Sequence, residues 1–310
     1  MKNIRWITEG AVLLALYIVL LLATLYMPIV GIILPFTLPI PFLIFAMRHE
    51  WKYSLILLVA ASLLSIVVSS LLTISTAIMF GTTGIVLGIM YKHKKRALQL
   101  LVAGALIYTI NLVALYIISV TFFSYNFIQQ SQELITQSIA FSEQFMRATG
   151  MQINENQLAQ MKQLPKIMGY ALPSLVIMGS FMMSWLTLII ATPILKRLRF
   201  EVQPWPLFRE IQMPKSVLYY YVLFLVVAMF IQVQEGSYLY IAILNLNLIL
   251  PIIMTIQGFS FLFLYCYKKE YPKFIPIVVV VLSIFIPFLF SLVSFLGIID
   301  LGFSLRNRLK

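Results

Sequence analysis

The chain has 310 residues, of which 62% are hydrophobic and only 10% are charged, and its formal net charge is +12. An ordinary soluble domain is roughly half apolar and about a quarter charged, so a water-soluble fold would not hide this much apolar surface. The continuous apolar runs exclude a soluble domain as the working part and predict an all-α polytopic transmembrane bundle rather than a barrel. The basic residues fall between these runs, so we expect lipid, and no nucleic acid, as the surrounding partner.

Apolar runs long enough to cross a hydrocarbon core, which takes roughly 20 helical residues, recur along the chain. The first, from Ile7 to Met27, is too long for a signal-peptide core and lacks a small-residue cleavage site, so it predicts a retained helix. Prolines between residues 28 and 41 leave the second run open, either as a straight helix or as a broken, re-entrant segment. About nine crossings are expected, from runs near residues 7–27, 29–47, 53–72, 74–91, 97–123, 167–195, 217–233, 238–266 and 274–298.

Basic residues in short loops set the orientation, because they are retained on the cytoplasmic side during insertion. With a cytoplasmic N-terminus in the cell membrane, 16 of the 22 Lys and Arg lie inside. The discordant element is the C-terminal tail, where Arg306, Arg308 and Lys310 would lie outside. If the last run folds back at Pro287 instead of crossing, the tail returns inside and the count becomes 19. Both arrangements stay open.

The charge pattern also divides the chain into parts. We expect a six-helix membrane core at 1–195, a cytoplasmic basic linker at 196–216 and further membrane helices at 217–310. Within the core, residues 124–166 are polar and amphipathic, and are expected outside the cell as one or two helices, the second capped by Asn154. This segment is either a surface hairpin or a lid over a pocket.

The sequence contains no nucleophile, paired carboxylates or metal ligands at the spacing that enzymes need, so we expect no enzyme and no cofactor or metal. The two histidines, His49 and His93, lie in basic loops and are expected to be solvated. Glu9 is the only acidic residue inside a predicted span, and we expect it to cap a helix or reach the interface. An interior nearly free of carboxylates disfavours a self-sufficient ion-coupled carrier, and without a Walker-type loop any ATP must be used by a partner.

Uncharged polar residues within the predicted helices are Asn111, Gln232, Asn245, Asn247 and Gln257. Such side chains often hydrogen-bond between helices, so structural bonding is the expectation for each, with ligand binding as the alternative. Asn245 and Asn247 lie about 200° apart around a helix, so they are not expected to face one pocket.

Small residues at four-residue spacing occur as Ala11 and Ala15 in the first run and as Gly84 and Gly88 in the fourth. This spacing lets helices approach closely. Contact within the bundle and contact with another membrane subunit both stay open, and we assign these four residues as candidates for the second.

The opening Thr8-Glu9-Gly10-Ala11 and the apolar run after it, the proline-rich second segment and the long loop after the fifth helix resemble the YybS family. These are predicted multi-pass membrane proteins of Gram-positive bacteria, and the resemblance covers the full chain. The family is in turn similar to the S-components of energy-coupling-factor vitamin transporters, which have six helices and both termini in the cytoplasm. The helices beyond residue 216 have no counterpart in S-components.

The S-component resemblance implies a membrane subunit that binds or takes up a small molecule. It implies a coupling subunit that contacts Ala11 and Ala15, and a ligand site open to the outside. That site would lie near the 27–36 loop and the outer parts of the fourth to sixth helices, with candidate ligand-binding residues Phe36, Tyr108, Asn111 and Trp185. The same clan includes scaffolds of the cell-shape machinery, so a non-transporting scaffold or regulator of other membrane proteins is the alternative.

Overall fold

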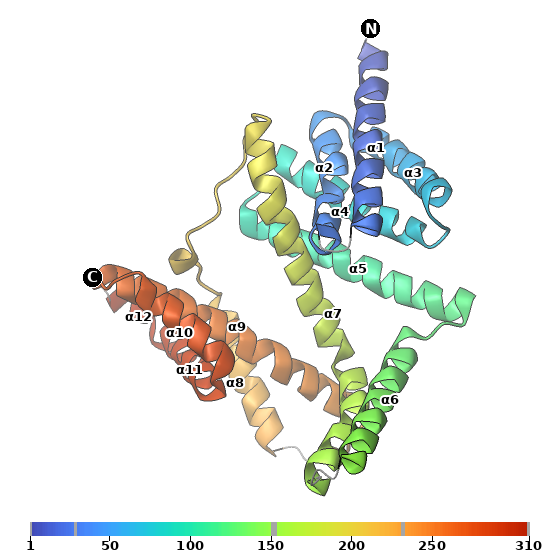
Figure 1. The fold of residues 1–310 in the computed structure, drawn as a ribbon. Helices are drawn as coiled ribbons and strands as arrows, with labels where there is room; N and C mark the ends of the chain where they lie inside the picture. The colour runs from blue at the N-terminus through green and yellow to red at the C-terminus, as the bar shows by residue number, and fades with distance from the viewer. Residues whose placement is uncertain (1, 28–29, 150–153, 231–232, 309–310) are drawn as a thin grey trace. The chain divides into compact units, whose positions relative to one another are not determined.

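The computed structural model describes residues 2–27, 30–149, 154–230 and 233–308. Every regular element in these residues is a helix (Figure 1). The elements form two compact units, the first comprising Met1–Gln130 and Val176–Trp205 and the second Ser131–Leu175 and Pro206–Lys310. An all-helical fold follows from the apolar runs, because backbone groups in lipid must bond within their own segment.

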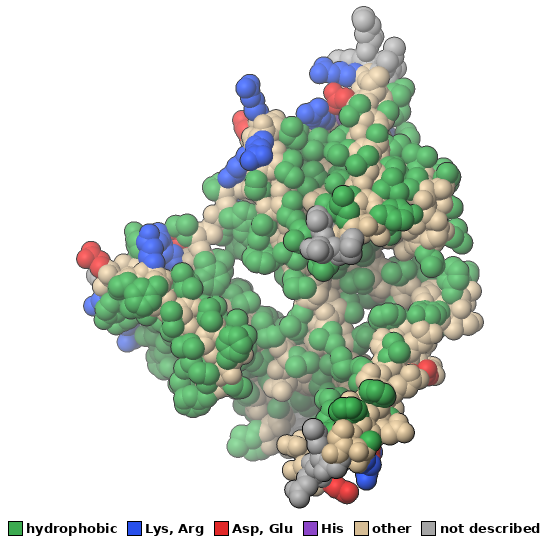
Figure 2. Space-filling model, viewed as in Figure 1, with side chains coloured by type: hydrophobic (Ala, Val, Ile, Leu, Met, Phe, Trp, Pro, Cys, Tyr) green, Lys and Arg blue, Asp and Glu red, His purple; other side chains and the backbone are tan. Residues whose placement is uncertain are grey.

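Among the described residues, 6 helices are long and apolar enough to cross a membrane. These helices are α1 (Lys2–Tyr26), α3 (Trp51–Val68), α4 (Thr73–Lys92), α5 (Ala97–Phe123), α7 (Glu155–Arg197) and α9 (Tyr238–Lys268). Shorter apolar helices are α2 (Pro39–Arg48), α8 (Lys215–Phe230), α10 (Phe274–Phe285) and α11 (Pro287–Phe303). Figure 2 shows hydrophobic side chains over the flanks of the helices and Lys and Arg gathered near helix ends, as expected for helices in lipid.

The first unit is organised around α2, which follows two short 3₁₀ turns, η1 (Val30–Ile32) and η2 (Leu34–Thr37). The proline-rich segment is therefore broken, one of the two alternatives that its sequence predicted. Pro39 begins α2, a position where the missing N–H would have had no helical partner. Residues 39–46 of α2 are buried, and Phe42 and Phe45 pack into a core with Tyr17 of α1 and Tyr108 of α5.

Gly84 and Gly88 of α4 lie against α2 within this unit. A Cβ on Gly84 would overlap the carbonyl oxygen of Pro39, and one on Gly88 would lie 2.5 Å from the carbonyl oxygen of Leu43. Both glycines therefore pack against α2 of the same chain, which is the contact within the bundle that the sequence left open, and a contact of either glycine with another membrane subunit stays a prediction. Four-residue spacing of small residues permits close approach but does not say which helix approaches.

The polar segment after α5 forms α6 (Phe127–Ala148) and the first turns of α7. The predicted cap is confirmed, since Oδ1 of Asn154 accepts hydrogen bonds from the backbone N–H groups of Asn156 at 3.1 Å and Gln157 at 3.3 Å. The helix that begins there continues into the sixth apolar run, so α7 has 43 residues. Residues 131–175 group with the C-terminal helices, whereas the domain boundaries expected from charge stay a prediction.

In the second unit, α11 packs closely along α9 (Figure 1). A Cβ on Gly258 of α9 would overlap the carbonyl oxygen of Val293, and one on Gly297 of α11 would overlap that of Met254, so both glycines are needed for this approach. The last apolar run breaks between Phe285 and Pro287 into α10 and α11.

The short α12 (Leu305–Arg308) follows α11 and returns the tail to the end of this unit where η3 (Phe208–Glu210) lies. Nη1 of Arg306 donates to the carbonyl oxygen of Arg209 at 3.2 Å, so the tail and the end of the linker are neighbours. The chain thus reverses direction at Pro287 within this unit, and whether the last run crosses the membrane stays a prediction. Gln232 and Lys310 lie outside the described residues.

Candidate functional site

Two of the four candidate ligand-binding residues bond to neighbouring helices in the first unit. Tyr108 is fully buried, and its hydroxyl shares a hydrogen bond of 2.9 Å with that of Thr187 on α7. Nδ2 of Asn111 donates to the hydroxyl of Thr82 on α4 at 3.0 Å and to the carbonyl oxygen of Ile107 at 2.8 Å. These contacts agree with the expectation of bonding between helices. A role of either residue in ligand binding stays a prediction.

The other candidate residues lie in different surroundings. Trp185 on α7 is 47% exposed, whereas Tyr108 is 0% exposed, so the two side chains do not line one enclosed space. Phe36 is half-buried in η2. Ala11 and Ala15 of α1 are exposed, and a contact of these residues with a partner helix stays a prediction.

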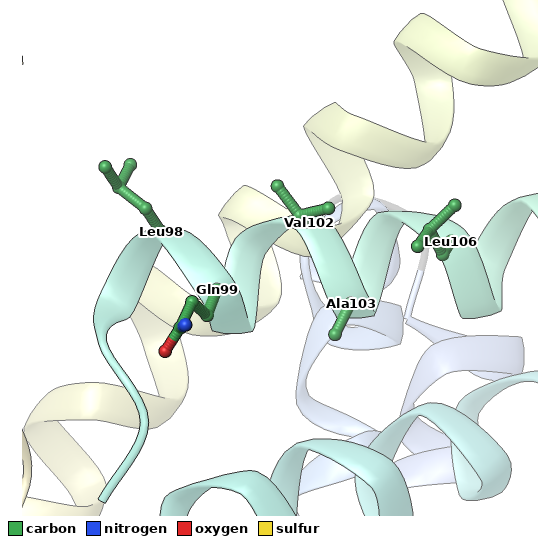
Figure 3. A pocket seen from close by; sticks show the side chains of 5 residues that line it. All are labelled: Leu98, Gln99, Val102, Ala103 and Leu106. Atoms are coloured by element: carbon green, nitrogen blue, oxygen red, sulfur yellow. The ribbon is translucent and has the colours of Figure 1, made fainter. Parts of the chain in front are cut away.

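A shallow depression lies on α5, lined by Leu98, Gln99, Val102, Ala103 and Leu106 (Figure 3). All five residues come from one helix, and the only polar one, Gln99, accepts the backbone N–H of Arg96 at 3.1 Å. A ligand site normally needs several polar groups that converge from different elements. This depression is therefore part of the helix surface and not a binding site.

A buried ion pair stands out in the second unit. Asp300 of α11 is fully buried, and its Oδ2 accepts from Nε of Arg306 at 2.8 Å and from Nε2 of Gln257 on α9 at 2.5 Å. The Arg306 side chain is itself only 10% exposed. Ser304 has the left-handed conformation, with φ of 50°, and ends α11 so that Arg306 turns back onto Asp300. The pair neutralises a carboxylate that burial would otherwise strongly destabilise.

The same side chains hold the linker segment 208–213 against α9. Nη2 of Arg306 donates to the Ser260 hydroxyl at 3.0 Å, and that hydroxyl lies 2.7 Å and 2.6 Å from the carbonyl oxygens of Phe208 and Ile211. Oε1 of Gln257 accepts the backbone N–H of Met213 at 2.9 Å. We call Gln257, Ser260, Asp300 and Arg306 the polar cluster. It joins α9, α11, the tail and the linker at one point.

Within the part of the chain that the structure describes, Oδ1 of Asp300 has no hydrogen-bond partner. A buried charged group inside a membrane protein is a candidate functional residue by default. With Arg306 already beside the carboxylate, the arrangement suits a structural latch better than a cation site, because a bound cation would be repelled by the guanidinium.

The sequence predicted that the last apolar run ends at residue 298, and α11 continues past that point through Asp300. The sequence signal for this ion pair is Asp300, which follows an apolar run, together with Arg306 six residues later. The bonding role expected of Gln257 is confirmed by its contacts with Asp300 and Met213.

The other asparagines of α9 behave as their spacing predicts. Asn245 donates through Nδ2 to the carbonyl oxygen of Tyr170 at 2.8 Å, and its Oδ1 accepts the backbone N–H of Ser174 at 2.7 Å. Asn247 is exposed, so the two do not face one pocket. Asn245 thus fixes the start of α9 to α7 within the second unit.

A second charged group lies in the first unit. The carboxylate of Glu9 on α1 lies 2.9 Å from Nε2 of His49, 3.6 Å from Arg48 and 3.3 Å from Arg5. His49 was expected to be solvated, but its side chain is only 18% exposed and its ring packs against Phe45. The histidine is held there because Glu9 of α1 lies beside the end of α2, a contact that residue spacing did not reveal.

The helical fold, the apolar flanks and the polar groups bonded inside each unit together define an integral membrane protein with several spans. Comparison with known proteins makes this more specific. The family described as "Predicted membrane protein (DUF2232)" matches residues 15–301, and the chain belongs to this family. It is 32% identical over 311 residues to "Uncharacterized protein YybS" of Bacillus subtilis (strain 168), covering 100% of both chains. No solved structure matches.

Proposed function

We propose that this protein is the small-molecule binding subunit of a membrane uptake complex, similar in plan to an S-component. The observation that carries the proposal is the first unit, which gathers α1 to α5 and the C-terminal part of α7 and presents Ala11 and Ala15 on the surface of α1. Small side chains at this spacing let a partner's helix approach the backbone closely. We also propose that this role is not catalytic.

The surroundings of Ala11 and Ala15 support a helix partner. Val12, Leu16 and Val19 on the same helix are 69%, 42% and 61% exposed, so this part of α1 meets either lipid or another protein. The sequence has no Walker-type loop, so the energy for uptake would come from the partner.

The topology that we propose has the N-terminus in the cytoplasm and about eight or nine crossings. In the second unit, Arg209 and Arg306 lie together at one end, with Arg209 over the ring of Tyr267 near the end of α9, 3.6 Å from its centre. The positive-inside rule assigns this end to the cytoplasm.

Purification of the complex from its native membrane tests the proposal. The protein is expected to retain both a small molecule and a second membrane subunit, and Ala11→Leu with Ala15→Leu is expected to remove the subunit. Ala114→Leu is the matched control, because Ala114 is an exposed alanine on α5 of the same unit. Recovery of neither a small molecule nor an energising partner would contradict the proposal.

A scaffold or regulator of other membrane proteins is the second candidate. It is favoured by Tyr108 and Asn111, whose polar groups bond to Thr187 and Thr82 of the same unit. The scaffold proposal expects the two alanine variants to break a complex while no small molecule is ever retained and no uptake is disturbed.

A further inference from the structure

Helix α6 has two apolar faces, of which only one is used inside the second unit. On the inner face, Ile139 is buried, and Gln132 donates to the carbonyl oxygen of Pro165 on α7 at 3.0 Å. Glu143 pairs with Lys162 of α7 at 2.8 Å. These contacts fix α6 to the first turns of α7.

The second face, which we call the outer stripe, comprises Leu134, Phe141 and Phe145. Their exposed fractions are 64%, 71% and 58%. Leu134 and Phe141 are seven residues apart, and Ser131 and Ser138 lie on the same side of the helix. A seven-residue repeat produces a narrow seam that suits packing against another helix.

The length of α7 indicates that the outer stripe meets water. A helix of 43 residues is about 65 Å long at about 1.5 Å per residue, roughly twice the thickness of a hydrocarbon core. Its first turns, which carry α6, therefore extend beyond the hydrocarbon. Three large apolar side chains exposed to water favour association with another apolar surface.

The charge around the stripe decides between possible partners. Helices that lie on anionic membranes carry Lys and Arg beside their apolar face. Here the neighbours at seven-residue spacing are the uncharged Gln130, Gln137 and Gln144, and Arg147 is paired with Glu143 at 2.9 Å. A second copy of the same helix would thus meet the stripe without bringing like charges together, as a symmetric contact requires.

We propose that the outer stripe of α6 is a self-association surface that pairs with α6 of a second copy of this chain. Both copies have the same orientation in the membrane, so the symmetry axis is normal to the bilayer and the two helices run in the same direction. Leu134 and Phe141 are at the centre of the contact, with Ser138 close to its counterpart. This inference does not depend on the proposed function.

Cysteine crosslinking of the full chain in native membranes tests the proposal. Both variants carry Cys266→Ala, because Cys266 is the only cysteine. Ser138→Cys is expected to form a disulfide-linked dimer with copper phenanthroline as oxidant. Ala140→Cys, an exposed residue on the other side of α6, is expected to form several-fold less.

Leu134→Lys with Phe141→Lys is expected to convert the dimer into a monomer by light scattering in detergent, with unchanged thermal unfolding because both side chains are exposed. A wild-type monomer in membranes and detergent, equal crosslinking at 138 and 140, or a crosslink from 138 to a different protein would each overturn the proposal. Loss of the small molecule or partner subunit alone would bear only on the proposed function.

Discussion

At the scale of single residues, the polar cluster buries one carboxylate whose charge is balanced by one arginine. Asp300 is fully buried and its Oδ2 is bonded to both Arg306 and Gln257. Removal of one member of a buried ion pair is strongly destabilising, because an uncompensated charge remains. Arg306 therefore contributes to stability mainly because, without it, the carboxylate of Asp300 would be buried and unpaired.

Arg306→Met is expected to lower the free energy of unfolding by about 3 kcal/mol. Thermal unfolding in detergent, followed by intrinsic fluorescence, measures the change. The double variant with Asp300→Asn is expected to be less destabilised than Arg306→Met alone, since the uncompensated charge is then absent. Arg308→Met is the control, because Arg308 is exposed in the same short helix. Equal melting of the Arg306 and Arg308 variants would contradict this role.

The polar cluster also marks the limit of what the sequence predicts about single residues. The bonding role of Gln257 follows from a polar amide inside an apolar run. The pairing of Asp300 with Arg306 does not, because it needs the turn at Ser304, whose left-handed conformation has no glycine to signal it. Glu9 and His49 are in contact although they are 40 positions apart in the sequence. The count of basic residues predicted only the side of the membrane on which they lie.

At the scale of elements, close helix packing depends on particular glycines. Gly84→Ala is expected to destabilise the first unit by about 1–3 kcal/mol, because the added Cβ overlaps Pro39 of α2. A Cβ on Gly179 of α7 meets nothing within 4 Å. Gly179→Ala is therefore the matched control, and its higher helix propensity is expected to stabilise the protein by up to about 1 kcal/mol. Melting temperatures of the two variants in detergent measure the difference, and a neutral Gly84→Ala would refute the packing argument.

The contact of α6 with α7 is expected to depend on pH. The hydrogen bond from Lys162, and then that from Arg147, lowers the pKa of Glu143 from its ordinary value of 4.5. A carboxyl with a lowered pKa stabilises the fold above its ordinary pKa, and this contribution is lost as the pH falls through the lowered value. Amide hydrogen exchange in α6, corrected for intrinsic rates, is expected to quicken between pH 7 and roughly pH 3.

Glu143→Gln removes the titrating group and is the control for this pH response. In that variant, α6 is expected to exchange faster at neutral pH and to change less on acidification. An identical acid response in both proteins would assign the effect to another carboxyl.

Element boundaries show how far sequence patterns reach. The long runs at α1 and α5 were predictable because nothing interrupts their apolar residues, and the prolines before α2 correctly raised the possibility of a break. The continuity of α7 was not predictable, because its first turns are polar and its later turns are apolar. This pattern predicts two separate segments. The spacing of Gly84 and Gly88 predicted a close contact but did not identify α2 as the partner, since a motif on one helix contains no information about the helix that faces it.

At the scale of the whole molecule, the fold-back at Pro287 has a consequence for topology. Arg306 bonds to the carbonyl oxygen of Arg209, so the tail ends on the same side as the basic linker. A reporter fused after the C-terminus is therefore expected in the cytoplasm, together with one inserted after Arg96, whereas one inserted near residue 150 is expected outside. Green fluorescent protein and alkaline phosphatase fusions at the three positions measure this, because each is active on only one side. If the tail reporter is cytoplasmic only when Arg306 is intact, the ion pair itself holds the tail. A tail found outside in the unaltered protein would instead mean that α10 and α11 cross together as one span.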